Sequence, residues 1–251
     1  MLKIFDKEPV NWQDLQIKVG KIFSDMNYLV EVEKNIQTVR EDINVDVYAE
    51  SSSSFAKEIV IAECKNWNTS VPKTIVHSFR TVISDIGANT GYIISKSGFQ
   101  NGAYTAAKNS NIYLMNYDEL QSNFRERWLE AMVFKMHTIG YPLKKYADGM
   151  ENFVIEESEL LSSEKYNQFK KLSQKYDRIS MCSIITMYKN PLTGKLELNY
   201  IDDIIERNVK NYFPKNIKVN CLSDYFDYLI TTFSKGVDEF DNLFGKKLRK
   251  R

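Results

Sequence analysis

The chain has 251 residues, of which 43% are hydrophobic and 13% are aromatic. A chain of this length and composition buries a sizeable core, which excludes a disordered or fibrous protein. The 34 Lys and Arg residues balance 33 Asp and Glu residues, giving a net charge of +1, so any nucleic-acid contact must come from a local basic patch.

The N-terminal segment and the cysteines bear on the cellular compartment. The start of the chain carries charges where a signal peptide needs an apolar core, and no run approaches the roughly 18 apolar residues of a membrane span. Cys64, Cys182 and Cys221 are scattered, without the spacing of a metal site or disulfide framework. We therefore expect a cytoplasmic protein without membrane contact.

The first half of the chain alternates between helical and strand patterns. Apolar residues at helical spacing predict a helix over residues 12–26, and three closely linked strand-like runs predict an antiparallel meander. Helices and strands then alternate up to about residue 120. The predicted strands are 28–39, 43–49, 58–65, 90–95 and 112–115, and the further helices are 71–86 and 100–109. This order predicts an α/β domain with a mixed β-sheet flanked by helices, over residues 1–120.

Residues 121–251 are predicted to form a mostly helical accessory region. A long helix should run from residue 117 to about 139 and end at Gly140 and Pro142. A helix over 158–176, a small hairpin and two more helices should follow, the hairpin comprising a strand at 179–188, a turn at 190–194 and a return strand. The region shows no catalytic motif, so we expect it to serve recognition, or assembly with a partner protein.

Three charged residues on the second and third strands are candidates for chemistry. Val45, Val47 and Ala49 should form one apolar face, which leaves Asp46 on the other. Glu63 and Lys65 share a face because they are two residues apart. If the strands are neighbours, Asp46 and Glu63 converge and offer oxygen ligands suited to Mg²⁺, with Lys65 near the scissile phosphate.

The same residues have a simpler structural interpretation. Glu63 and Lys65 could form a salt bridge at the strand end while Asp46 is merely solvated. The spacing alone does not separate the two interpretations.

The wider context of these residues resembles the Mrr-like restriction endonuclease domain of the PD-(D/E)xK nuclease superfamily. The resemblance runs from about residue 12 to 120 and includes NVDVYAE, IVIAECKNWN, VHSFRTVISDIGANTGYIISKSGFQNGA and NIYLMNYDEL. It implies that Asp46 and Glu63 bind a divalent metal, Mg²⁺ with Mn²⁺ as a substitute, and that Lys65 assists water attack on the phosphodiester. Gln16 stands where many relatives carry a metal-binding Glu in the first helix.

DNA contacts are considered for three further segments. Lys96, Ser97 and Gln100 lie where a strand leads into a helix, whose free N–H groups attract phosphate; the alternative is a capping turn with Ser97 as the cap. Arg80 lies off the apolar stripe of its helix and either reaches a phosphate or is simply solvated. Five of the last six residues, 246–251, are basic, which predicts either phosphate attraction or an ordinary solvated end.

The sequence thus predicts a Mg²⁺-dependent endonuclease that hydrolyses DNA, in prokaryotic restriction or antiviral defence as the resemblance implies. Cutting both strands usually needs two active sites, which suggests a homodimer. The alternatives are a repair or structure-specific nuclease on the same fold, and a non-catalytic nucleic-acid-binding or assembly module.

Overall fold

A computed structural model gives the structure of residues 1–38, 40–51, 57–148, 151–185 and 200–245. The chain divides into two compact units. The first comprises residues 7–128, and the second comprises residues 1–6 together with residues 129–251. Each unit is described by itself.

The first unit is built on a five-stranded mixed sheet with the strand order β1-β2-β3-β4-β5. Strands β1, β2 and β3 are antiparallel, whereas β3, β4 and β5 are parallel. The elements in chain order are α1 (Trp12–Asp25), β1 (Tyr28–Gln37), β2 (Asp42–Ser51), β3 (Ile59–Lys65), α2 (Lys73–Ile86), β4 (Thr90–Ser95), α3 (Asn101–Ala107), β5 (Ile112–Met115) and the first turns of α4 (Tyr117–Asp148). The predicted α/β class with a mixed, helix-flanked sheet is confirmed.

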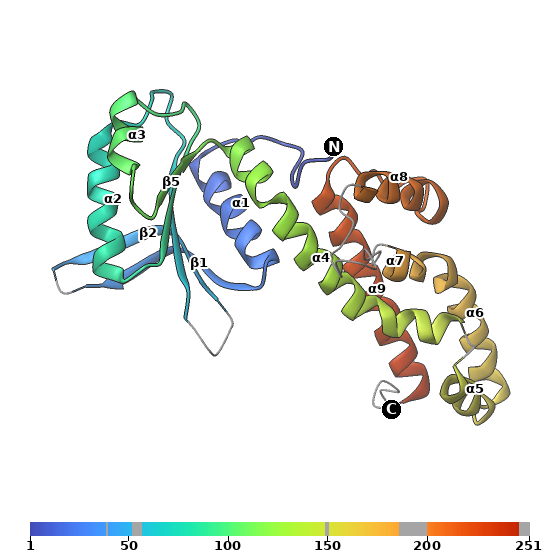
Figure 1. The fold of residues 1–251 in the computed structure, drawn as a ribbon. Helices are drawn as coiled ribbons and strands as arrows, with labels where there is room; N and C mark the ends of the chain where they lie inside the picture. Colours follow the sequence, from blue (N-terminus) through green and yellow to red (C-terminus); the bar gives the residue numbers. More distant parts are fainter. Residues whose placement is uncertain (39, 52–56, 149–150, 186–199, 246–251) are drawn as a thin grey trace, which may run out of the picture. The chain divides into compact units, whose positions relative to one another are not determined.

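Helices cover both faces of this sheet (Figure 1). Helix α2 and α3 pack together on one face, and α1 packs on the other against β1, β2 and β3. Gly91 of β4 permits the close approach of α2, because a Cβ at this position would lie 2.3 Å from Cδ1 of Ile83. The parallel strand β4 beneath α2 is mostly buried, as is typical of strands of this kind.

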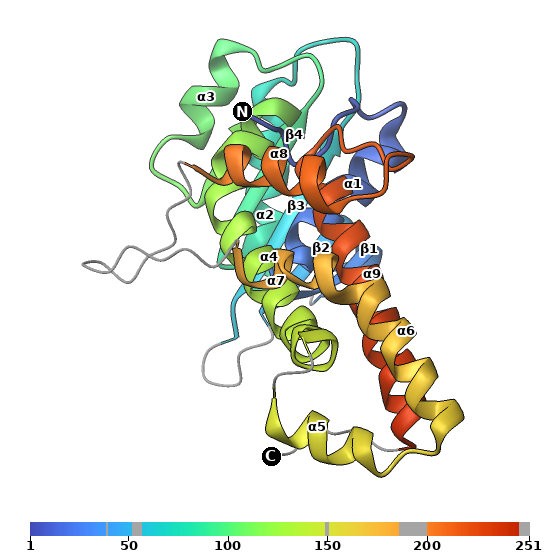
Figure 2. The ribbon, with the colours of Figure 1, turned by 90° about the vertical axis from the view of Figure 1, so that its right-hand side faces the viewer.

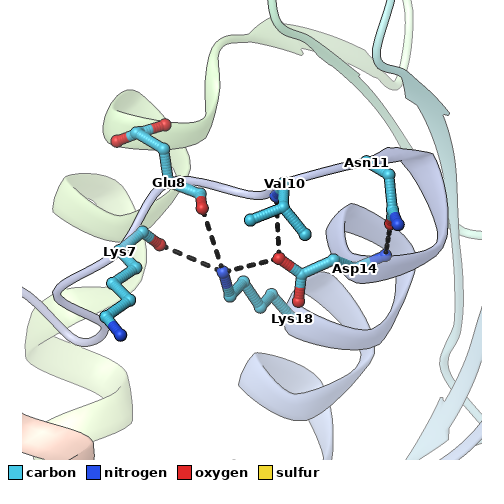
Figure 3. Close-up of polar contacts among 6 residues, drawn as sticks. All are labelled: Lys7, Glu8, Val10, Asn11, Asp14 and Lys18. Carbon is cyan, nitrogen blue, oxygen red and sulfur yellow. Dashed lines mark hydrogen bonds and ion pairs between the residues drawn. The ribbon is translucent and has the colours of Figure 1, made fainter.

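Helix α1 begins at a network of polar contacts that fixes the chain entering it (Figure 3). Asn11 caps the helix by accepting a hydrogen bond from the N–H of Asp14 at 2.8 Å. Asp14 in turn accepts from the N–H of Val10 at 2.9 Å and pairs with Lys18 at 2.8 Å. Such capping satisfies N–H groups that the helix itself leaves without partners. The first turn of α1 is thereby held at a defined position.

All regular secondary structure in the described part of the second unit is helical. It contains the remainder of α4, α5 (Asn152–Glu159), α6 (Ser163–Ser180), α7 (Cys182–Ile185), α8 (Ile201–Tyr212) and α9 (Leu222–Phe244). Figure 2 shows α6 and α9 side by side, and Tyr176 of α6 donates a hydrogen bond to Glu239 of α9 at 3.1 Å. The predicted mostly helical character of this region is confirmed. Within the described residues, no helix is long and apolar enough to cross a membrane.

The predicted end of the long helix at Gly140 and Pro142 is wrong, because α4 continues to Asp148. Gly140 allows close packing within the helical unit, since a Cβ there would lie 2.4 Å from Cδ2 of Phe233. Proline inside a helix costs roughly 3 kcal/mol. Leu143 and Tyr146 follow it and are both almost fully buried, and each such burial contributes roughly 1.5–3 kcal/mol. Packing of the last turns therefore outweighs the local break signal.

The predicted strand at 179–188 is also wrong where the structure describes it. Residues 179 and 180 end α6, and Cys182–Ile185 form α7. Ser183 donates its hydroxyl hydrogen bond to the carbonyl of Ser180, at 2.7 Å, which supports the helical turn. The remainder of the predicted hairpin, at residues 186–199, lies outside the described residues.

Candidate active site

The candidate site lies at the carboxyl end of two parallel neighbours, β3 and β4. Glu63 pairs with Ile93, and Lys65, the last residue of β3, pairs with Ser95, the last residue of β4. The N–H of Lys96 then donates to the carbonyl of Lys65 at 3.0 Å. The loops that leave both strands therefore start from the same edge of the sheet, where ligands of open α/β sheets are typically bound.

Asp46 on β2 stands opposite Glu63 at the point where the β2–β3 ladder stops. The last pair of that ladder is Val47 with Ala62, and the same register places Asp46 across from Glu63. Instead of a main-chain pair, Oδ2 of Asp46 accepts a hydrogen bond from the N–H of Cys64 at 2.6 Å. The side chain of Asp46 thus reaches across to β3 where the two strands cease to pair.

The side-chain alternation of β2 changes at Asp46, which corrects the predicted face of Val45, Val47 and Ala49. Val45 packs with Tyr48 in the hydrophobic cluster beneath α2, although residues three apart in a regular strand point to opposite faces. Val47 faces α1, because a Cβ on Gly20 would lie 3.9 Å from its Cγ1. The side-chain alternation is therefore interrupted at Asp46, which lies outside the regular pleat of β2.

The two carboxylates interact electrostatically. Burial raises the pKa of Glu63, and the negative charge of Asp46 raises it further, against the lowering effect of Lys65. Two acidic groups in this arrangement repel unless a cation lies between them. Among the described residues, no cluster of three or more His, Cys, Asp or Glu side chains is arranged to hold a metal. Mg²⁺ is commonly held by one or two carboxylates with water and phosphate oxygens, which this pair satisfies.

Lys65 contacts the carboxylate of Glu63 through Nζ, and its side chain is 17% exposed. The same Nζ lies 5.2 Å from the ring centroid of Trp67, whose side chain is 40% exposed. The salt bridge suggested as the simpler interpretation is therefore present. It also holds the Lys65 cation beside the carboxylate pair, so this contact by itself does not separate catalysis from structure.

Gln16 is placed on α1 and is only 3% exposed. It lies one helical turn before Gly20, which approaches the sheet closely. In the described part of the chain, no hydrogen bond or ion pair joins Gln16 to Asp46, Glu63 or Lys65. The structure therefore brings three of the four predicted catalytic and metal residues together and leaves the fourth nearby in the fold without such a contact.

The loops after β3 and β4 are tied together by side chains. Lys96 Nζ donates to Oδ1 of Asn68 at 3.1 Å, Ser97 Oγ donates to the carbonyl of Trp67 at 2.7 Å, and Ser70 Oγ donates to the carbonyl of Ser97 at 3.1 Å. Asn68 and Ser70 were not singled out from the sequence. No local pattern reveals them, because their partners lie about 28 residues further along the chain.

The alternative in which Ser97 caps the following helix is wrong. The N-cap of α3 is Gln100, and no side-chain hydrogen bond caps this helix. Gln100 is exposed, and its N–H donates to the carbonyl of Val71 at 3.0 Å. Ser97 instead helps to hold the two loops together, as described above.

Arg80 is exposed on α2 and donates through Nη2 to the carbonyl of Ala106, in the last turn of α3. This bond ties two helices and gives Arg80 a structural role that the sequence did not reveal. A guanidinium has five N–H donors, so the remaining donors stay available to a phosphate.

Cys64 lies between Glu63 and Lys65 and is 6% exposed. Burial raises the pKa of its thiol well above the ordinary value, and the charges of Asp46 and Glu63 raise it further. The thiolate is therefore scarce at neutral pH, so Cys64 behaves as a buried apolar residue and not as a nucleophile.

Comparison with known proteins gives one family. Residues 8–124 match a family model described as restriction endonuclease. Comparison with curated proteins gives no match. Among solved structures, a crystal structure of a protein of unknown function shares 13% sequence identity and a TM-score of 0.39, with 94% of this chain and 100% of that chain covered.

Proposed function

Because residues 8–124 form an Mrr-like restriction endonuclease domain of the PD-(D/E)xK superfamily, we propose that the protein is a divalent-metal-dependent endonuclease that hydrolyses DNA phosphodiester bonds. The observation that carries the proposal is the meeting of Asp46, Glu63 and Lys65 at the end of β3. A mere solvated acid at position 46 would not be expected to face a second, largely buried carboxylate.

Asp46 and Glu63 would hold the metal, with Gln16 proposed as a third ligand. The fit rests on two facing carboxylates, whose oxygens are the ligands that Mg²⁺ and Mn²⁺ accept. Burial raises the pKa of Glu63 and the nearby charge of Asp46 raises it further, so a cation at this pair would favour the ionised form of Glu63. A bound divalent cation would neutralise charge at the attacked phosphate and favour hydroxide formation from water.

Lys65 would stabilise the negative charge that develops on the phosphate during water attack. Its Nζ is already held at the carboxylate pair by Glu63, so the cation is placed before substrate arrives. Preorganised charges of this type stabilise the transition state without a reorganisation cost. Trp67, next to Lys65 and partly exposed, forms one wall beside this cation.

Lys96, Ser97, Gln100 and Arg80 are proposed to contact the DNA backbone. Lys96 and Ser97 begin the loop that starts beside Lys65, and they would offer a cation and a hydroxyl to the DNA backbone there. Arg80 would act from the α2–α3 surface. The basic residues 246–251 lie outside the described residues and remain a proposed electrostatic contact.

The wider role is proposed from the family resemblance. We assign the protein to restriction or antiviral defence in the cytoplasm of a prokaryote, acting as a homodimer. The nuclease domain, proposed as residues 1–120, would cleave DNA. The accessory region, proposed as residues 121–251, would serve recognition or assembly with a partner protein. A repair or structure-specific nuclease would use the same catalytic residues, because a fold does not choose its substrate.

One observation favours a non-catalytic alternative. Gln16 brings no charge to the site, and Lys65 already compensates part of the charge of Glu63. A nucleic-acid-binding or assembly module would keep this ion pair for stability and perform no turnover. Only the nuclease should cleave DNA, and its cleavage should require both a metal and these residues.

The test is cleavage of supercoiled, linear, single-stranded and modified DNA, with Mg²⁺, with Mn²⁺ and with a chelator. Metal-dependent cleavage that disappears in Asp46→Asn and Glu63→Gln is expected. Glu50→Gln is the matched control, because Glu50 is also paired with a lysine, Lys57 at 2.9 Å, but at the opposite end of the β2–β3 ladder. Binding without cleavage under all conditions would support the non-catalytic module instead.

A further inference from the structure

Glu33 of β1 has an unusual backbone conformation directly across from the candidate metal ligand Asp46. Its φ is 54°, in the left-handed region that residues with a side chain rarely adopt. In the described residues the other non-glycine positions with positive φ are Asn27 and Asn109, and Asn tolerates this region better than most residues do. A glutamate has no such preference, so the surrounding structure must hold Glu33 in this conformation.

The left-handed residue coincides with the break in the β1–β2 ladder. Val32 pairs with Val47 and Lys34 pairs with Val45, so the register is continuous, but Glu33 and Asp46 between them form no pair. The carbonyl of Glu33 accepts a hydrogen bond from Nδ2 of Asn44 at 3.4 Å. The side chain of Asn44 therefore hydrogen-bonds the carbonyl of Glu33, which lies where the two strands do not pair.

The same step changes which side chains share a face. Lys34 Nζ lies 3.8 Å from the ring centroid of Tyr48, although Lys34 pairs with Val45 and Tyr48 pairs with Glu31. The alternation of side chains between the two faces of the sheet is therefore shifted by one residue in both strands. The shift occurs between residues 31 and 34 of β1 and between residues 45 and 48 of β2. Asp46 lies at this step, and its carboxylate reaches from β2 to the N–H of Cys64 on β3.

We infer that Glu33 is a positioning residue, whose left-handed backbone conformation turns Asp46 out of the β-pleat and towards β3. The side chain of Glu33 is exposed, so its contribution is made through the backbone and not through its carboxylate. The geometric part of this inference stands on the β1–β2 ladder, and its catalytic consequence rests on the proposed nuclease function. It predicts that residue type at position 33 matters through tolerance of positive φ and not through charge.

Substitutions that differ in this tolerance test the inference. Glu33→Gly and Glu33→Asn should preserve the site, and Glu33→Ala should behave like wild type, because alanine tolerates positive φ no worse than glutamate. Glu33→Val should impair the site, because β-branched residues are the least tolerant of positive φ. Gln37→Val is the matched control. Gln37 is also exposed on β1 and pairs with Asp42, but its φ is not positive.

Hydrogen exchange of the Cys64 amide measures the position of Asp46 without any assay of activity. In the Val variant this amide should exchange at least about 10-fold faster than in wild type, while the amides of Val60 and Ile61 in the same strand keep their rates. The Gly, Asn, Ala and Gln37→Val variants should keep the wild-type rate at Cys64. Equal acceleration of all three amides in the Val variant, or an unchanged Cys64 amide in it, would overturn the inference.

Cleavage kinetics give the second readout. If wild type cleaves DNA, kcat should fall by about 10²-fold in Glu33→Val with little change in KM, since a displacement of about 1 Å in an active site has effects of this size. Glu33→Gly should keep the turnover of wild type. If wild type does not cleave but the exchange pattern is as expected, the nuclease proposal fails and the positioning role of Glu33 stands. Full turnover in the Val variant would remove that role.

Discussion

The carboxylate of Asp46 accepts a hydrogen bond of 2.6 Å from the N–H of Cys64, the residue between Glu63 and Lys65. This bond joins the β2 acid directly to the strand that carries the other two candidate catalytic groups. It forms where the main-chain pairing of β2 with β3 ends, so the site occupies the point of divergence between two strands.

Replacement of Lys65 by alanine should reduce turnover more than DNA affinity. The cation acts on charge that develops during water attack, and removal of one such stabilising group typically costs about 10²- to 10³-fold in rate. Lys57→Ala is the matched control, because Lys57 also pairs with a glutamate, Glu50, but far from Asp46 along β2. Single-turnover cleavage and DNA affinity should be measured for both variants. Near-normal cleavage by Lys65→Ala would mean that the only role of Lys65 is its salt bridge to Glu63.

A divalent cation should raise the thermal stability of the wild-type protein. Ligands that bind only the folded state stabilise it, by about 2.7 kcal/mol at a concentration 100-fold above Kd. The increase in melting temperature with Mg²⁺ or Mn²⁺ should vanish in Asp46→Asn. The same shift in wild type and in this variant would place the bound ion elsewhere.

Gln16→Leu tests whether the amide on α1 is a metal ligand. If it is, the variant should need at least about 10-fold more Mg²⁺ for half-maximal cleavage, whereas Gln16→Glu should need less because a carboxylate adds charge. The buried position of Gln16 makes Leu a suitable apolar replacement of similar size. Identical metal dependence in all three proteins would remove Gln16 from the ligand set.

The pH dependence of stability should carry the signature of Glu63. Its pKa in the folded protein is raised above the ordinary value of 4.5, first by burial and then by Asp46. The stability associated with protonated Glu63 is therefore fully present below pH 4.5 and is lost as pH rises through the higher folded value. Glu63→Gln should consequently be more stable than wild type at pH 7, without metal, and the difference should shrink towards pH 4. A constant difference across this range would contradict the raised pKa.

Gly140→Ala should destabilise the helical unit, because the added Cβ would lie 2.4 Å from Cδ2 of Phe233. Overpacking of this kind typically costs about 1–3 kcal/mol of unfolding free energy. Gly102→Ala is the matched control in α3, where the nearest atom to the added Cβ is Lys73 Cδ at 3.5 Å. Urea denaturation should show a loss for Gly140→Ala and no loss for Gly102→Ala. Equal stability of the two variants would mean that Phe233 can move aside.

The candidate site could be predicted from sequence as far as residue types and strand periodicity reach. Asp46, Glu63 and Lys65 follow from charged residues at the end of apolar runs, and the structure brings them together. The face assigned to Val45 was wrong because alternation assumes a regular strand. Nothing in the local sequence marks Glu33 as left-handed, since the conformation depends on pairing with β2.

The helical unit shows the same limit for local signals. Gly140 and Pro142 are strong break signals in isolation, but α4 continues through them because its last turns are buried. Residues 179–185 contain β-branched and small residues typical of a strand, yet Ile179 and Cys182 are buried in helical segments. Tertiary packing decided these elements, and a propensity summed over neighbours does not contain that information.

The burial of Cys64, Cys182 and Cys221 makes the natural protein suitable for site-specific labelling. Burial raises the pKa of each thiol, so maleimide reagents should find little reactive thiolate in the folded chain. A cysteine introduced at an exposed position such as Gln37 would then be the preferred site for a fluorophore. Fluorescence could follow DNA binding in a protein that keeps all of its native cysteines.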